Sequence, residues 1–247
     1  MQSAKITSND DFHRNFAISK QGDVTVEGRT VLFNIGPVEV SSVMTTMAAI
    51  TILLALLAYF STRHLQERPT GIQNLMEKWI EMLRNFLAGI VGERNINYYF
   101  PYLATLFVFI LVSNYSGLIP FCGIIPGFAA PTSVVNVTAG LAVCTFCLTH
   151  YAGIKNNGPR YIRHFTKPFI FMLPLILIDE FVRPLSLTLR LYGNIFGEET
   201  VGHEIFNLIP VAVPVILQAL SLLMGFIQAL VFVLLSAFYI GESSEEL

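Results

Sequence analysis

Residues 179–199 read DEFVRPLSLTLRLYGNIFGEE, which places two arginines and four carboxylates between two apolar runs. The run before this stretch covers Phe169–Ile178, and the run after it, Ile205–Ile240, contains no charged residue. The second run is much longer than the roughly 20 residues that an α-helix needs to cross the hydrocarbon of a bilayer. The chain thus avoids charge in its apolar regions and concentrates it in this one stretch.

Arg190 is the residue of this stretch that most needs an explanation. Both of its neighbours are leucines, and the nearest acid in the sequence, Glu198, is eight positions away. An arginine at the centre of a bilayer costs about 2.5 to 3.5 kcal/mol or more. We therefore expect a group outside this helix, or a water-filled cavity, to compensate its charge.

The composition of the whole chain agrees with a membrane location. The chain has 247 residues, of which 53% are hydrophobic and 13% are charged. Soluble domains carry about 25% charged residues, so this composition predicts an integral membrane protein. The net charge of −2 and the lack of a basic cluster argue against a nucleic-acid partner. Cys144 and Cys147 lie in an apolar run, and we interpret them as buried core residues rather than metal ligands.

The predicted fold class is an all-α integral membrane protein with five membrane-crossing helices. These helices are expected at about residues 43–60, 102–121, 134–152, 169–196 and 205–240. Residues 72–90 repeat apolar side chains at helical spacing and carry charges on the opposite side. This pattern predicts an amphipathic helix that lies in the membrane interface.

The remaining residues divide the chain into an N-terminal segment and one membrane domain. Residues 1–40 are polar and mixed in charge, and they are expected outside the lipid on the extracytoplasmic side. Short strand-like pieces stand at 24–26 and 31–35 within this segment. Residues 41–247 are expected to form a single membrane domain.

The last two helices are expected to be long and strongly tilted. A straight helix over 205–240 would measure about 54 Å at a rise of 1.5 Å per residue, against a hydrocarbon core about 30 Å thick. The helix must tilt, kink at Pro210 and Pro214, or break into two pieces. We favour a strong tilt, because 217–240 contains neither a proline nor a charge.

The distribution of lysine and arginine predicts the orientation in the membrane. Residues 61–100 carry five basic residues and residues 153–168 carry four, whereas 122–133 and 197–204 carry none. Basic loops tend to remain in the cytoplasm. The N-terminus is then outside, and five crossings place the C-terminus in the cytoplasm.

One polar stripe is expected along the fourth crossing helix. Residues spaced by three or four positions share a helix face, and this face would carry Asp179, Arg183, Ser186 or Leu187, Arg190 and Asn194. Asp179 and Arg183 are close enough to pair with each other, so they and Glu180 are read as either entrance or structural residues.

A second polar stripe is expected on the last helix, where Gln218, Ser221, Gly225 and Gln228 follow one another at helical spacing. Such a face usually contacts protein or water rather than lipid. The alternative interpretation is that these residues only pack the helix against its neighbours. Between the two helices, Glu199 and His203 would be one turn apart if helical, and both can titrate. The sequence shows no convincing metal-ligand pattern, so neither a metal nor a cofactor is expected.

From the residues alone, the sequence indicates an ion-translocating membrane protein whose Arg190 faces a carboxylate on a partner. The alternative is a self-contained ion-coupled secondary transporter. Such transporters are usually longer and are built from two repeated halves, and no internal repeat is visible here.

Several ordered motifs resemble subunit a of the F-type ATP synthase. The most specific is PLSLTLRLYGN at 184–194, and the others are SNYSGLIP at 113–120, residues 131–138, QALVF at 228–232 and YIGE at 239–242. The resemblance covers roughly residues 33–243. It implies a non-catalytic stator subunit, without a cofactor, that conducts H⁺ or Na⁺ and couples ion flow to rotation for ATP synthesis.

The resemblance also implies partners and residue roles. Arg190 matches the arginine that faces the carboxylates of a rotating c-ring between two half-channels. The family's other partners are subunit b and the rest of the ATP synthase, embedded in the cell inner membrane or, alternatively, a plastid thylakoid membrane. Further polar positions of the family are matched by Asn114, Asn136, Arg183, Asn194, Glu199 and Gln228.

The chain departs from the family pattern at a few polar positions. Gly117 and Val134 stand where some members have an aspartate, and Ser221 stands where some members have a histidine. We hypothesise that His203, one turn beyond Glu199, takes over part of the missing histidine's role in the ion pathway.

Overall fold

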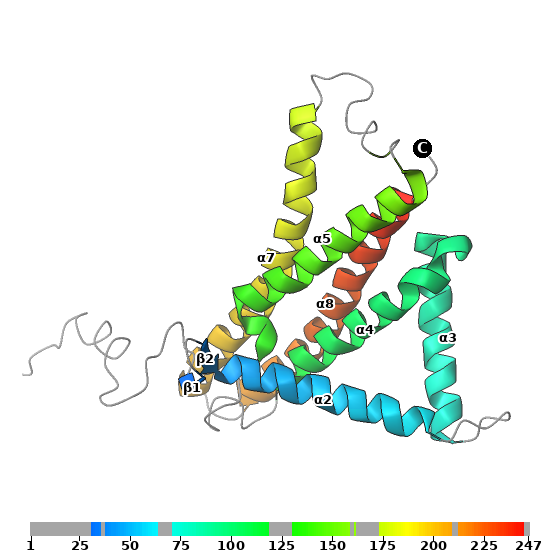
Figure 1. Cartoon of the computed structure of the whole chain (residues 1–247). Coiled ribbons are helices and arrows are strands. Elements are labelled where there is room, and N and C mark those ends of the chain that lie inside the picture. The colour runs from blue at the N-terminus through cyan, green and yellow to red at the C-terminus, as the bar shows by residue number, and fades with distance from the viewer. Residues whose placement is uncertain are drawn as a thin grey trace, which may run out of the picture.

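The computed structural model describes residues 31–35, 38–63, 71–118, 130–158, 161, 173–208 and 212–244. Its elements, shown in Figure 1, are β1 (Val31–Ile35), β2 (Val38–Ser41), α2 (Ser42–Thr62), α3 (Ile72–Val91), α4 (Glu93–Gly117), η1 (Pro131–Ser133), α5 (Val135–Asn157), α7 (Leu173–Leu208) and α8 (Ala212–Ser244). The strands β1 and β2 pair as an antiparallel hairpin, which confirms the strand expected at 31–35. The piece at 24–26 lies outside the described residues.

The all-α membrane class is confirmed, since the described residues are almost entirely helical. Four segments are long and apolar enough to cross a membrane, namely α2, α4, α5 and the part of α8 from Ile216 to Ser244. The fifth expected crossing, α7, does not qualify by composition because charged residues are spread along its 36 residues. Its length of about 54 Å is nevertheless more than a bilayer requires.

The expected ends of the last two helices were wrong. Residues 197–204, expected as a loop, are helical and belong to α7, which ends at Leu208. Gly197 costs a helix only about 1 kcal/mol and does not end it. Pro210 lies in the sequence between the end of α7 and the start of α8, and proline disfavours a continuous helix because it lacks the amide hydrogen and clashes with the preceding turn. A single helix from 205 to 240 is therefore wrong as well, since α8 begins at Ala212 with Pro214 in its first turn. The strong tilt expected for this helix remains a prediction.

The other helices differ less from expectation. Helix α4 begins at Glu93 rather than at 102 and contains Pro101, a residue that membrane helices tolerate when neighbouring groups satisfy the freed carbonyl. Helix α5 runs on to Asn157. The amphipathic helix α3 agrees with its expected range and buries Leu83 and Leu87 while its charged side remains exposed.

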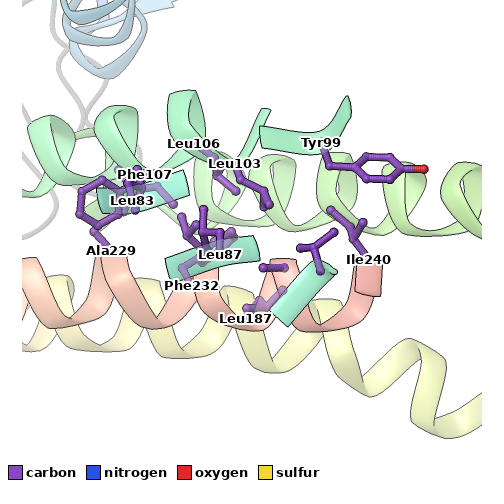
Figure 2. Packing of buried hydrophobic residues seen from close by; sticks show 14 of the residues in the cluster. Leu83, Leu87, Tyr99, Leu103, Leu106, Phe107, Leu187, Ala229, Phe232 and Ile240 are labelled. Atoms are coloured by element: carbon purple, nitrogen blue, oxygen red, sulfur yellow. The ribbon is translucent and has the colours of Figure 1, made fainter. Parts of the chain in front are cut away.

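The core lies where α3, α4, α7 and α8 meet. Helix α8 packs against α3, α4, α5 and α7, and α5 also packs against α7. Figure 2 shows Leu83 and Leu87 of α3 pointing into the space between α4 and α8, where they meet Leu103 and Phe232. Figure 1 shows α2 leading away from this core, and its second half is exposed.

One glycine sets the closest approach between α3 and α8. A Cβ added at Gly241 would stand 2.8 Å from the backbone oxygen of Ile90 and 3.4 Å from the Cα atom of Val91. Only a residue without a side chain allows the two backbones to pack at this distance. The end of α8 is thereby held against the end of α3.

The two cysteines of α5 are not core residues, contrary to expectation. Cys144 and Cys147 are both free and exposed. Cysteine behaves as a small apolar residue, so the lipid-facing surface of a membrane helix accommodates it as readily as a core does.

Candidate functional site

Arg190 lies on the exposed side of α7. The buried side of this helix is formed by Leu187, Leu191 and Ile195, which pack into the core. The exposed neighbours of Arg190 are apolar, and Leu189 is 55% exposed. Within the described residues, Arg190 makes no hydrogen bond or ion pair. A cation with no local partner is thus presented among apolar side chains at the surface of the subunit.

Arg183, two turns earlier on α7, has a different environment. Its guanidinium donates to the carboxylate of Asp179 at 3.2 Å and to that of Glu242 at 2.8 Å. It also lies 5.0 Å from the centre of the Tyr239 ring. Two acids therefore neutralise Arg183, and its contacts join α7 to the end of α8. The expected pair of Asp179 and Arg183 is present in the structure.

Asn194, one turn beyond Arg190, reaches across to α8. Its side-chain amide donates to the Oε1 atom of Gln228 at 2.8 Å. Gln228 is 4% exposed, and its Nε2 atom has no hydrogen-bond partner within the described residues. A buried amide donor without a partner costs about 1 to 3 kcal/mol, which makes this group a natural donor to a water molecule.

A third polar contact joins α4 to α8 close to this pair. The side-chain amide of Asn114 donates to the backbone oxygen of Gly225 at 2.9 Å. The Oδ1 atom of Asn114 is buried and accepts no hydrogen bond from the described residues. Asn114 and Gln228 therefore each bury one polar atom that the described residues leave unsatisfied.

Polar residues near the start of α8 contact other parts of the subunit. The Glu198 carboxyl of α7 is within hydrogen-bonding reach of the Ser221 hydroxyl. The Gln218 amide donates to the backbone oxygen of Leu118 at 2.6 Å. Gln218, Ser221, Gly225 and Gln228 thus form one face that contacts α4 and α7, as their spacing indicates.

The polar stripe expected along α7 is interrupted. Leu187 is buried in the core, Arg183 turns to Glu242, and Arg190 is exposed. The residues that do line up are Arg190, Asn194 and Glu198, each four positions after the last. Glu198 was not among the expected pathway residues, although this spacing could have indicated it.

The remaining expected residues are placed less centrally. Asn136 is exposed at the start of α5 and makes no hydrogen bond to the described part of the chain. Glu180 is paired with His150 of α5. The backbones of Glu199 and His203 lie one turn apart in α7, but their side chains are outside what the structure describes, so the hypothesis about His203 remains a prediction.

Four helices long and apolar enough to cross a membrane define a multi-pass helical membrane protein. Its helix α7 carries one arginine paired with acids and another that has no partner within the described residues. Comparisons with known proteins give the family. Residues 42–241 match the family model described as ATP synthase A chain.

Similar proteins of the same kind are known from several bacteria. The chain is 41% identical to ATP synthase subunit a of Trichlorobacter lovleyi over 87% of this chain and 92% of that protein. It is 42% identical to ATP synthase subunit a 1 of Pelobacter propionicus over 80% and 85%. It is 41% identical to ATP synthase subunit a of Moorella thermoacetica over 85% and 94%.

The chain belongs to the ATP synthase subunit a family. Membership gives it the stator role of that subunit in the F-type ATP synthase and makes it a multi-pass membrane protein. Of the two functions considered from the sequence, the comparisons support the first.

Proposed function

We propose that Arg190 faces the carboxylates of a rotating c-ring and separates two half-channels, through which ions reach and leave that ring. The observation that carries this proposal is the exposure of Arg190 on α7 without a partner among the described residues. An exposed arginine surrounded by leucines is costly in lipid. A ring carboxylate that releases its ion and becomes ionised beside Arg190 removes this cost, and each rotation step supplies a new one.

Polar groups on both sides of Arg190 support two separate routes. Glu198 follows Arg190 by eight residues and Glu180 precedes it by ten, which along a helix is about 12 Å and about 15 Å. The sum of about 27 Å is close to the roughly 30 Å of bilayer hydrocarbon. We assign Ser221, Glu198, Asn194, Gln228 and Asn114 to the outer route, and Asp179, Glu180 and Arg183 to the inner one.

The coupling follows from elementary electrostatics. A ring carboxylate that has bound its ion is neutral and can turn into the lipid. Beside Arg190 the ionised form is favoured, because an opposite charge within about 4 to 6 Å lowers the pKa of a carboxyl group. The ion leaves by one route and the site is reloaded from the other. Each charge that crosses contributes about 2.3 kcal/mol per 100 mV of membrane potential.

We place the chain in the cell inner membrane, with subunit b and the c-ring as its immediate partners. Helices α2, α4, α5 and α8 supply the apolar surface for a multi-pass location. The inner end of α7 then lies on the cytoplasmic side, together with the basic residues at 61–100 and 153–168. The N-terminus lies outside.

Substitution of Arg190 tests the proposal. ATP synthesis driven by an imposed ion gradient is measured in vesicles that contain the complete ATP synthase. Arg190→Ala is expected to abolish coupled synthesis and to allow passive ion leak, since no cation then separates the two routes. Lys78→Ala removes an exposed cation of α3 and should leave synthesis unchanged. Coupled synthesis in the Arg190→Ala vesicles would refute the proposal.

The same vesicles distinguish the coupling ion. ATP-driven ion uptake is followed with and without sodium, and with and without a protonophore. Collapse of coupling by the protonophore in sodium-free medium identifies H⁺, whereas uptake that needs sodium and resists the protonophore identifies Na⁺.

A further inference from the structure

A histidine and a glutamate meet across α5 and α7 near the inner end of the bundle. The Nδ1 atom of His150 lies 3.5 Å from the Oε1 atom of Glu180, and the two side chains are 29% and 12% exposed. Within the described residues, the Nδ1 atom is buried and makes no hydrogen bond. Two groups that can both exchange protons are thus held against each other, with the carboxylate mostly buried and the imidazole partly exposed.

The charged groups around this pair are already paired with one another, so they do not compete with His150 for the Glu180 carboxylate. The other titratable or charged residues on the elements packed against it are Asp179, Arg183, Tyr239, Glu242 and Tyr161. Arg183 is already neutralised by Asp179 and Glu242. In the described part of the chain, His150 is therefore the group that lies against the Glu180 carboxylate, and the two form an ion pair when the imidazole is protonated.

Aromatic rings hold the imidazole in place. The Phe146 ring centre lies 4.2 Å from that of His150, and the Tyr161 ring centre lies 6.1 Å from it. Such contacts fix the orientation of a side chain. His150 is accordingly a positioned group rather than a freely rotating surface histidine.

A pocket extends from Glu180 toward the level of Arg190. It lies among α5, α7 and α8 and is lined by Thr145, Thr149, Glu180, Arg183, Leu187 and Tyr239 among others. Leu187 is three residues before Arg190 on α7. The lining is mostly apolar, and the hydroxyls of Thr145 and Thr149 donate to backbone oxygens of α5. Glu180 is therefore the lining residue whose oxygens can meet an internal water.

We propose that His150 and Glu180 form the proton-exchanging pair of the inner route, which rests on the proposed function above. A proton from the aqueous side binds the neutral imidazole of His150, and the resulting imidazolium is stabilised by the ionised Glu180. The imidazolium then releases this proton along the pocket toward the ring carboxylate and returns to its neutral form. One proton enters and one leaves, in either direction of rotation.

Imidazole suits this task because its charge changes between about pH 5 and pH 8. Glutamate alone would hold a proton too weakly at neutral pH, and a lysine would hold it too firmly. The assignment concerns H⁺ as the ion of the inner route, since the imidazole takes up and releases a proton.

The test uses the complete ATP synthase in proteoliposomes with the inner side facing the medium. ATP-driven proton uptake and ATP hydrolysis are measured between pH 5 and pH 9. We expect His150→Gln to lower proton uptake about tenfold. This effect is smaller than that of removing a positioned acid–base catalyst from an enzyme, because water can partly replace the imidazole as a proton carrier. The remaining uptake should lose its pH dependence between about pH 5 and pH 8.

Two further variants separate proton exchange from a structural role. The exchange variant His150→Glu/Glu180→His retains both groups in reversed positions and should restore most of the uptake and its pH profile. Lys155→Gln removes an exposed cation from the same helix and should leave both unchanged. A structural ion pair would not alter the pH profile when one partner becomes a neutral amide.

Three outcomes overturn the inference. Uptake by His150→Gln with the wild-type pH profile would exclude proton exchange at this site. Failure of both His150→Gln and Glu180→Gln complexes to assemble would assign the pair to anchoring α5 on α7. Coupled uptake that requires sodium would show that the inner route does not conduct protons. Arg190→Ala is measured in parallel to separate the two proposals. If the Arg190→Ala complex retains coupling, the proposed function itself is refuted. If Arg190→Ala loses coupling while His150→Gln keeps the wild-type uptake and pH profile, only the role of the pair is refuted.

Discussion

The contact at Gly241 gives a prediction whose size follows from the structure. In Gly241→Ala, the new methyl group would stand 2.8 Å from the Ile90 oxygen and 3.4 Å from the Val91 Cα atom. Both are backbone atoms, so they cannot rotate away as a side chain would. Overpacking of this kind costs about 1 to 3 kcal/mol. For a chain of this size, that lowers the unfolding midpoint Tm by about 2 to 12 °C.

A glycine on α5 provides the matched control. A Cβ added at Gly140 has no atom within 4 Å, and alanine in the middle of a helix is favoured over glycine by about 0.5 to 1 kcal/mol. Gly140→Ala should therefore keep or slightly raise the Tm. The assay is thermal unfolding of the detergent-purified membrane sector containing each variant. Equal Tm values for Gly241→Ala and the wild type would show that α3 and α8 do not constrain each other here.

Two further predictions concern the polar and exposed faces of α7. Gln228→Leu should destabilise the membrane sector by about 1 to 3 kcal/mol, because Asn194 loses its hydrogen-bond acceptor. The double variant Asn194→Leu/Gln228→Leu should cost less free energy than the sum of the two single changes. Additive changes in Tm would refute a direct interaction between the two side chains. Gly193 is exposed and an added Cβ would have no atom of the described residues within 4 Å, so Gly193→Leu should leave the Tm unchanged. If the exposed face of α7 meets the ring, Gly193→Leu should lower coupled ATP synthesis about tenfold or more, as misplacement at a reacting centre does. Synthesis by this variant at the wild-type rate would show that the ring contacts a different face.

The fold class could be predicted because uncharged runs longer than a bilayer requires have few other interpretations. The helix ends could not be predicted from the same patterns. The expected helices began at 102 and ended at 196, yet the adjacent Pro101 and Gly197 both lie inside helices. Membrane helices retain such residues because neighbouring groups satisfy the freed backbone, and a local pattern contains no information about those neighbours.

The site was predictable only where its contacts are local. The pairing of Asp179 with Arg183 follows from a separation of four residues. The contact of Arg183 with Glu242 joins residues 59 positions apart, and that of Asn194 with Gln228 joins residues 34 apart. These depend on the register in which α7 and α8 pack side by side. His150 could not be recognised for the same reason, since Glu180 lies on another helix.

The different environments of Arg183 and Arg190 have a consequence for biogenesis. Arg183 is paired with Asp179 and Glu242 of the same subunit, so its charge is compensated without a partner protein. Arg190 has no partner within the described residues. A newly inserted subunit without its ring would therefore expose a cation to lipid acyl chains, where local thinning of the bilayer and water penetration would follow. We expect such orphan subunits to be short-lived in the cell, so that Arg190 also acts as a checkpoint for correct assembly.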